Sequence, residues 1–218
     1  MKRGAIFDMD GLMFDTEKVY QKTWLELAEE RGVNLSPAFA GEICGTAGDV
    51  MVGVLQKHFH TDSGDARAVM DSCMDRVRHK LSAAVPEKPG VRDIIGFFRL
   101  AGVKIAVASS SREEQIRSNL RTTGLAEEID VIVSGFSVQN SKPAPDIFLK
   151  AAAKLGLPAE DCYVFEDGFN GVRAGHAAGS FTVMIPDLLA PDDEMRVKAD
   201  VICGSLSDAL DSIRDGLW

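Results

Sequence analysis

The feature that most constrains this chain is a short apolar run that ends in two acidic residues. Residues 4–7 read Gly-Ala-Ile-Phe, and Asp8, Met9, Asp10 and Gly11 follow directly. A run without polar alternation is typical of a parallel strand that is covered on both faces. In extended backbone, residues two positions apart point the same way, so Asp8 and Asp10 begin on one side. Open α/β sheets bind their ligands at the carboxyl ends of the strands, so we predict a site here.

Beyond residue 90 the chain alternates between apolar strands and amphipathic helices, which predicts a doubly wound parallel sheet. We predict strands over residues 103–108, 130–133, 162–165, 181–185 and 201–202. We predict helices over residues 91–100, 111–123, 146–155, 172–178 and 206–213. One isolated N-terminal strand cannot bury both of its faces, so we expect it to join this sheet in a Rossmann-like α/β core.

The stretch between the first strand and this core carries only helical patterns. One helix is expected to begin at Asp15-Thr16-Glu17, and others are expected over residues 46–59 and 65–81, the last with a stripe of Met70, Met74, Val77 and Leu81. We therefore predict a core made of residues 1–15 and 85–218, with an all-helical cap of residues 16–84 inserted after the first strand. The alternative is a separate helical domain that follows a stray strand.

Composition restricts the class of partner. Of the 218 residues, 45% are hydrophobic and 26% are charged, which is ordinary for a globular protein. The net charge of −9 argues against nucleic-acid binding, because phosphate backbones need basic faces. No apolar run approaches the roughly 20 residues of a membrane span. The cysteines show no CxxC spacing and positions 1–4 show no signal peptide, so we expect reduced thiols in a cytoplasmic protein. We expect a monomer or a weak dimer.

Polar residues also follow three of the later predicted strands. They are Ser109-Ser110-Ser111 after the second strand, Lys142 after the third, and Glu166-Asp167 at the end of the fourth. The topology of an open α/β sheet brings these strand ends to the same edge as Asp8 and Asp10. Carboxylate oxygens suit Mg²⁺, and serine hydroxyls, backbone amides and a lysine ammonium suit a phosphate.

Each motif also has a simpler structural explanation. Asp8 to Gly11 alone would be an acidic turn, and the serine run would be a helix cap. Lys142 would be a solvated surface charge, and Glu166-Asp167 would cap the next helix. His58 and His60 are expected to be a solvated pair rather than metal ligands. The occurrence of four motifs at four strand ends favours the functional explanation for the acidic, serine and lysine sites.

Together the motifs resemble the haloacid dehalogenase-like superfamily. The resemblance rests on the run from Phe7 to Gly11, on Asp15-Thr16-Glu17, on Ser109, on Lys142-Pro143 and on Glu166-Asp167, which occur in this order across nearly the whole chain. Within that superfamily, the chain is similar to the phosphatases and mutases of the β-phosphoglucomutase-like branch, which carry a helical cap at this position.

The resemblance implies a role for each residue at the strand ends. Asp8 would attack phosphorus and form an aspartyl-phosphate. Asp10 would protonate the leaving oxygen and later deprotonate the attacking water. Mg²⁺ would be held by Asp8, by the backbone carbonyl of Asp10, and by Glu166 and Asp167. Ser109, the Ser110 amide and Lys142 would bind the phosphoryl oxygens.

The resemblance also points to substrate-selecting residues in the cap, namely Thr16, Tyr20, Gly45 and Arg76. Mutases of this branch hold a second phosphate with a cap-loop arginine, whereas this chain has Gly45 there, and it has Tyr20 where those mutases have a histidine. The loss of a bidentate clamp favours a phosphatase of a small phosphorylated metabolite, with a sugar phosphate expected. A phosphosugar mutase is the alternative, and a non-catalytic module that binds phosphate or Mg²⁺ is a more distant one. Arg76 has a simpler explanation as part of an exposed basic helix face.

Overall fold

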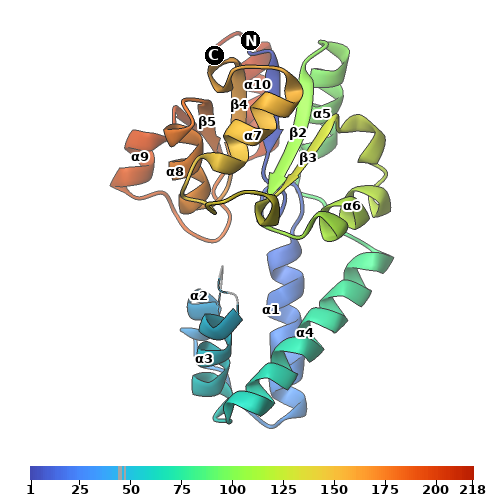
Figure 1. Cartoon of the computed structure of the whole chain (residues 1–218), viewed down its shortest axis with the longest axis vertical. Helices are drawn as coiled ribbons and strands as arrows, with labels where there is room; N and C mark the ends of the chain where they lie inside the picture. Colours follow the sequence, from blue (N-terminus) through green and yellow to red (C-terminus); the bar gives the residue numbers. More distant parts are fainter. Residues whose placement is uncertain (44–45, 47) are drawn as a thin grey trace. The chain divides into compact units, whose positions relative to one another are not determined.

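The computed structural model describes residues 1–43, 46 and 48–218, and these residues form two compact units. One unit comprises Met1–Asp15 with Val85–Trp218, and the other comprises Thr16–Ala84. Figure 1 follows both units along the chain. The first is an α/β unit and the second is entirely helical, lying in the sequence between the first and second strands. The predicted fold class, a parallel α/β fold with a helical insertion, is confirmed.

Within the described residues, six parallel strands form one sheet in the order β3-β2-β1-β4-β5-β6. They are β1 (Gly4–Phe7), β2 (Lys104–Ser109), β3 (Val131–Ser134), β4 (Cys162–Glu166), β5 (Phe181–Met184) and β6 (Val201–Ile202). Strand β1, which directly precedes Asp8, lies between β2 and β4, and Phe7 is opposite Val107 on β2 and Phe165 on β4. All four residues of β1 are buried, as its unbroken apolar run predicts.

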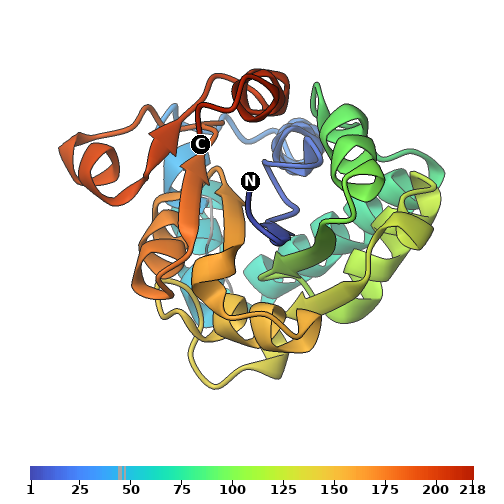
Figure 2. The same ribbon diagram turned by 90° about the horizontal axis from the view of Figure 1, so that it is seen from above.

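Helices cover both faces of this sheet. Those of the α/β unit are α5 (Val91–Leu100), α6 (Glu113–Thr122), α7 (Asp146–Leu155), α8 (Phe169–Ala177), α9 (Asp193–Lys198) and α10 (Leu206–Arg214), with short 3₁₀ turns η1 (Ala126–Glu128), η2 (Gly135–Ser137) and η3 (Ala159–Asp161). Figure 2 shows α5 and α10 over one face and α7 over the other. Alternate residues of β1 therefore enter different cores, with Phe7 stacking on Phe165 near α5 and Ile6 packing near Phe148 of α7.

Helix α9 is one of two short helices that the sequence prediction missed. Its N-cap is Asp192, whose side chain accepts a hydrogen bond from the amide of Met195. Met195 is fully buried and packs with Val172 of α8 and Met184 of β5. The helix has only six residues, too few to display a helical period in the sequence.

The helical unit contains α1 (Thr16–Glu30), α2 (Phe39–Ile43), α3 (Gly48–Phe59) and α4 (Ser63–Ala83). Helix α4 packs against α1 and α3, and its buried residues are Ala66, Val69, Cys73, Val77 and Leu81. The predicted stripe was therefore partly wrong, because Met70 and Met74 are only half-buried. The buried face of α4 includes the small residues Ala66 and Cys73, which do not stand out in a pattern of large apolar side chains. The other missed helix, α2, has five residues.

The prediction that His58 is solvated was also wrong. Its side chain is buried, with Nε2 3.0 Å from Glu42 Oε2 and Nδ1 3.3 Å from Ser36 Oγ. The imidazole also lies edge-on to the ring of Phe39. His60, two positions later, is exposed as expected. His58 is therefore a core residue of the helical unit with hydrogen-bonding partners from other segments.

None of the helices in the described ranges is both long and apolar enough to cross a membrane. Cys73, Cys162 and Cys203 are free thiols. Burial raises the pKa of the Cys73 thiol to about 12 and that of Cys162 to about 11. Both thiols are therefore protonated at neutral pH and unsuited to act as nucleophiles.

Candidate active site

Asp8 follows directly on β1 and lies at the carboxyl edge of the sheet. Its amide donates a 3.0 Å hydrogen bond to the carbonyl of Phe165 on β4, which extends the strand pairing by one residue. Asp8 is buried, and so is Glu166, the last residue of β4. The pairing of β1 with β4 thus brings two carboxyl groups from distant parts of the sequence to one edge.

Lys142 lies between these two carboxyl groups. Its Nζ is 2.5 Å from Asp8 Oδ1 and 2.6 Å from Glu166 Oε1, and it also donates to the carbonyl of Ala108 at 3.2 Å. The side chain of Lys142 is only 8% exposed, so its explanation as a solvated surface charge is wrong. Burial opposes the charge, but Asp8 and Glu166 outweigh it and raise the pKa of the ammonium above its ordinary 10.5. Lys142 is therefore a buried cation at neutral pH.

The acidic groups at the end of β4, Glu166 and the following Asp167, have an excess of negative charge around them. Burial raises the pKa of Glu166 to about 7, with Lys142 opposing this rise and Asp8 adding to it. Burial, followed by the charges of Glu166 and Asp8, raises the pKa of Asp167 well above its ordinary value. One ammonium therefore does not compensate the carboxyl groups at this edge.

Two glycines provide the space for these carboxyl groups. A Cβ atom at Gly11, whose φ is +91°, would lie 2.3 Å from Asp167 Oδ2. A Cβ atom at Gly171, in the first turns of α8, would lie 1.8 Å from the carboxyl carbon of Glu166. Any side chain at either position would displace an acidic group, so both glycines shape the site.

Asp10 is held by two serines of the loop that follows β2. Its Oδ2 accepts hydrogen bonds from Ser109 Oγ at 3.1 Å and from Ser111 Oγ at 2.8 Å. The amide of Ser111 in turn donates to Ser109 Oγ at 3.0 Å. Ser110 lies between them and is exposed. The sequence analysis placed all three serines at this edge but gave a role only to Ser109 and Ser110, because the contact of Ser111 with Asp10 depends on the loop conformation rather than on any motif.

The residues proposed from the helical insert belong to the other unit. Arg76 on α4 forms a two-pronged ion pair with Glu30 on α1, with Nη1–Oε1 and Nη2–Oε2 distances of 2.6 and 2.7 Å. Thr16 is buried and Tyr20 is half-buried, both on α1. Gly45 lies outside the described residues. A role for these four residues in binding substrate stays a prediction.

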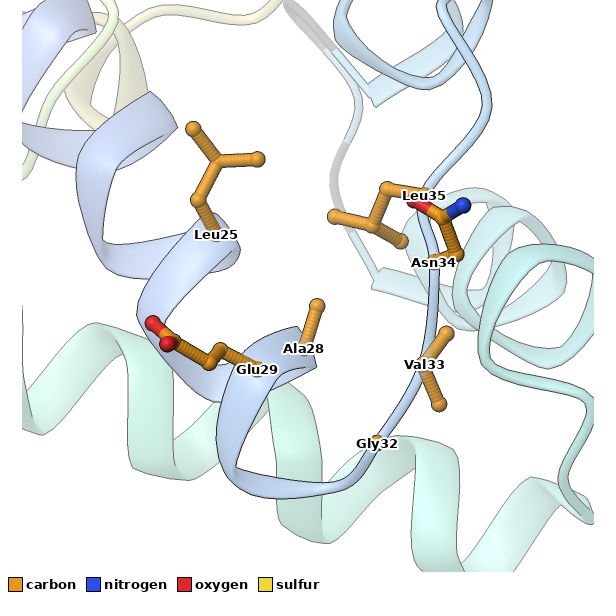
Figure 3. Close-up of a pocket in the computed structure, with 7 residues that line it drawn as sticks. All are labelled: Leu25, Ala28, Glu29, Gly32, Val33, Asn34 and Leu35. Carbon is orange, nitrogen blue, oxygen red and sulfur yellow. The ribbon is translucent and has the colours of Figure 1, made fainter.

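The helical unit also has an open hollow of about 500 Å³, drawn in Figure 3. Leu25, Ala28 and Glu29 of α1 line one side of it, and residues 32–35 line the other. Of these seven described residues, none carries a positive charge and one carries a negative charge. This lining is unsuited to a phosphate, so the sheet edge around Asp8 is the better candidate for phosphoryl chemistry.

The acidic edge has the donor chemistry for a hard cation. Among the described residues, no group of three His, Cys, Asp or Glu side chains lies in position to hold a metal ion, and Asp8 and Glu166 both contact Lys142. The groups available at this edge are nevertheless carboxyl oxygens, the ligands that Mg²⁺ and Ca²⁺ prefer. The raised pKa values of Glu166 and Asp167 indicate that additional positive charge would be favourable here. The residue types at this edge therefore suit a divalent cation by their donor chemistry.

The fold and this edge together define a doubly wound α/β enzyme with a buried lysine–carboxylate site. A family model described as haloacid dehalogenase-like hydrolase matches residues 5–185. The chain therefore belongs to the haloacid dehalogenase-like hydrolase family, as the sequence motifs predict. Membership of this family generally implies a metal cofactor.

Individual relatives agree with this assignment. The chain is 30% identical over 207 residues to hexitol phosphatase B of Escherichia coli (strain K12), and the match covers 94% of this chain and 92% of the relative. A Thermotoga maritima protein provisionally called a β-phosphoglucomutase has a crystal structure that matches with a TM-score of 0.83 at 26% identity, over 99% of both chains. A family hydrolase from Deinococcus radiodurans R1, solved with bound phosphate and sodium, matches with a TM-score of 0.83 at 26% identity, over 98% of this chain and 96% of that one. Within this family, the chain is thus similar to the β-phosphoglucomutase-like proteins and to sugar-alcohol phosphatases.

Proposed function

We propose that this chain is a Mg²⁺-dependent phosphatase that hydrolyses a small phosphorylated sugar or sugar alcohol through an aspartyl-phosphate at Asp8. The observation that carries the proposal is the 2.5 Å contact between Lys142 Nζ and Asp8 Oδ1 at the end of β1. A carboxylate and a phosphate repel each other, so attack requires a fixed cation beside the nucleophile. Lys142 supplies that cation in a buried setting, where charge interactions are strong.

In the first step, a carboxylate oxygen of Asp8 forms a bond to phosphorus, and the bond from phosphorus to the substrate oxygen breaks. That oxygen leaves as an alcohol after it takes a proton from Asp10. The contacts of Ser109 and Ser111 with Asp10 Oδ2 fix the orientation of this carboxyl group before the substrate arrives. Ser109, the Ser110 amide and Lys142 bind the phosphoryl oxygens.

In the second step, a water molecule attacks the phosphorus of the aspartyl-phosphate. Asp10, now ionised, takes the proton from this water, and the bond between phosphorus and Asp8 breaks. Inorganic phosphate leaves, and both carboxyl groups return to their starting states. The same residue thus acts as the acid in one step and as the base in the next.

The acidic edge would hold the metal through Asp8, the backbone carbonyl of Asp10, Glu166 and Asp167. When bound, Mg²⁺ supplies positive charge that stabilises the negative phosphoryl oxygens. The raised pKa values of Glu166 and Asp167 support a need for this charge. We propose Mg²⁺ rather than a softer metal because every proposed ligand is an oxygen.

The substrate class is proposed from the similarity to hexitol phosphatase B, whose name identifies it as a phosphatase of hexitol phosphates. We propose that Thr16, Tyr20, Gly45 and Arg76 select the substrate from the helical insert. A glycine at position 45 gives no bidentate clamp for a second phosphate, which favours hydrolysis over phosphoryl transfer within a bisphosphate.

The test is phosphate release from a panel of hexitol phosphates, hexose phosphates, nucleotides and phosphorylated amino acids, with Mg²⁺ and then with EDTA. We expect release from at least one hexitol or hexose phosphate that requires Mg²⁺ and is lost in Asp10→Asn. Interconversion of hexose phosphates without release of phosphate would replace the phosphatase by a mutase. Binding of Mg²⁺ with neither reaction would contradict an enzymatic role at this site.

A further inference from the structure

Two stretches of chain connect the α/β unit to the helical insert, and they pair with each other inside the α/β unit. The amide of Lys88 donates to the carbonyl of Met13 at 2.9 Å, and the amide of Asp15 donates to the carbonyl of Pro86 at 2.8 Å. A β-bridge between Phe14 and Glu87 lies between these two hydrogen bonds. The two connections therefore form a short antiparallel ribbon.

The first strand of this ribbon is continuous with the turn that carries Asp10. The amides of Met13 and Phe14 both donate to the carbonyl of Met9 at 3.0 Å, and the amide of Gly11 donates to the carbonyl of Phe14 at 2.9 Å. Residues 9–14 thus form one closed turn, with Asp10 near its start. Any group that fixes the ribbon also fixes the backbone from which the Asp10 carboxyl group extends.

The side chain of Lys88 joins this ribbon to the loop after β5. Its Nζ is 2.5 Å from Asp187 Oδ1 and 3.7 Å from Asp15 Oδ1. The three side chains are largely buried, at 18%, 11% and 17% exposed for Lys88, Asp187 and Asp15. The loop that carries Asp187 is itself tied to the site, because the amide of Ile185 donates to the carbonyl of Glu166 at 2.7 Å.

Apolar packing alone does not explain this arrangement. Leu12, Met13 and Phe14 of the turn are already fully buried. Their burial holds the turn in the core, but the hydrophobic effect is non-directional and does not define its orientation. A buried ion pair adds little net stability, because desolvation offsets the attraction, but its contacts are satisfied in only one geometry. The ion pair of Lys88 therefore acts on position more than on stability.

We propose that Lys88, through Asp187 and Asp15, is a positioning residue that fixes the turn carrying Asp10 for proton transfer. The inference rests on the proposed role of Asp10 as the acid that protonates the leaving oxygen. A looser turn would misplace this carboxyl group by a fraction of an ångström, and such shifts slow enzymatic steps strongly. Lys142 and Ser109 lie outside the turn, so we expect their contacts with the phosphoryl group to change less than the position of the Asp10 carboxyl group.

This role makes a prediction that a purely structural one does not. An alkyl phosphate releases a basic oxygen that needs a proton, whereas p-nitrophenyl phosphate releases a stable phenolate that needs little protonation. We expect Lys88→Met to lower kcat/KM on an alkyl phosphate roughly tenfold or more. On p-nitrophenyl phosphate we expect a change of less than about threefold.

The experiment compares Lys88→Met with Arg117→Met, which removes an exposed ion pair to Glu113 on α6. Amide hydrogen exchange of residues 9–14 is measured without substrate in both variants, and faster exchange is expected only in Lys88→Met. If Lys88→Met does not fold, the double variant Lys88→Met/Asp187→Asn replaces it. The double variant leaves one buried negative charge fewer without a cation than the single variant does.

The outcomes separate this inference from the proposed function. If exchange of residues 9–14 in Lys88→Met is unchanged, as in Arg117→Met, and any loss of kcat/KM is equal on alkyl and aryl phosphates, the positioning role is overturned and the phosphatase stays intact. Faster exchange of residues 9–14 in Lys88→Met, when the wild type releases no phosphate, overturns the proposed function and supports only that Lys88 fixes the turn. Faster exchange with a selective loss on alkyl phosphates supports both.

Discussion

Lys142 and Asp8 are 134 positions apart in the sequence, yet Lys142 Nζ lies 2.5 Å from Asp8 Oδ1. Asp8 ends the central strand β1, and Lys142 precedes α7, which packs against β1, β2 and β3. The contact therefore depends on the whole doubly wound topology rather than on local structure. It converts a carboxylate that would repel phosphate into one beside a permanent positive charge.

Replacement of Lys142 by methionine removes the ammonium charge and keeps most of the packing of the aliphatic part of the side chain. We expect phosphate release to fall by roughly 100-fold or more, because a fixed charge beside the transferred group is lost. The unfolding free energy in EDTA should fall by about 3–5 kcal/mol, since two buried carboxyl groups lose their cation. Steady-state kinetics and urea denaturation measure the two effects. Lys154→Met, which removes an exposed lysine of α7, is the control, and equal behaviour of the two variants would contradict the account.

The pKa of Glu166, raised from 4.5 to about 7 by burial despite Lys142, predicts how stability depends on pH. Between these values the folded chain binds a proton more tightly than the unfolded chain, so the unfolding free energy falls as pH rises. In EDTA we expect a decrease on the order of 1–3 kcal/mol across this window. Asp167, whose pKa is also raised, contributes in the same direction.

Urea denaturation at several pH values, in EDTA, measures this dependence, and Glu166→Gln should flatten it. Addition of Mg²⁺ should stabilise the protein more at the upper end of the window, because metal ligands must be deprotonated. A stability that rises with pH over this range in EDTA would contradict the assigned direction. A Mg²⁺ effect that is independent of pH would argue against binding by these carboxyl groups.

Gly171→Ala should disturb the site although alanine favours helices. Its Cβ atom would lie 1.8 Å from the Glu166 carboxyl carbon, so Glu166 would have to leave its contact with Lys142. We expect a loss of about 1–3 kcal/mol in unfolding free energy, together with reduced activity. Gly96→Ala in α5 is the matched control, because its Cβ atom would meet nothing within 4 Å, and it should be neutral or slightly stabilising. Thermal unfolding of both variants tests the difference.

The sequence alone predicts the strands of the α/β unit well, because a parallel strand buried on both faces leaves an unbroken apolar run. The run at 103–108, for example, corresponds to β2 with a shift of one residue. Short elements such as α2 and α9 carry too few residues for a helical period, and they form because Phe39 and Met195 are buried by tertiary packing.

For the site, the sequence predicts which residues gather at the sheet edge but not how they contact each other. Nothing local indicates that Lys142 divides its hydrogen bonds between Asp8 and Glu166, or that Ser111 joins Ser109 on Asp10. His58 shows the same limit, because its partners Glu42 and Ser36 are 16 and 22 positions away. Such contacts are set by the folded topology and cannot be obtained from residue types and spacing.

The central claim is that Asp8 accepts the phosphoryl group. The most direct measurement mixes the protein with Mg²⁺ and a hexitol or hexose phosphate that it hydrolyses, stops the reaction with acid within one turnover, and locates phosphate on the peptides by mass spectrometry. We expect phosphate on the peptide that contains Asp8 in the wild type. In Asp8→Asn we expect no phosphorylated peptide and no hydrolysis. Phosphate release by Asp8→Asn at the rate of the wild type would contradict the account.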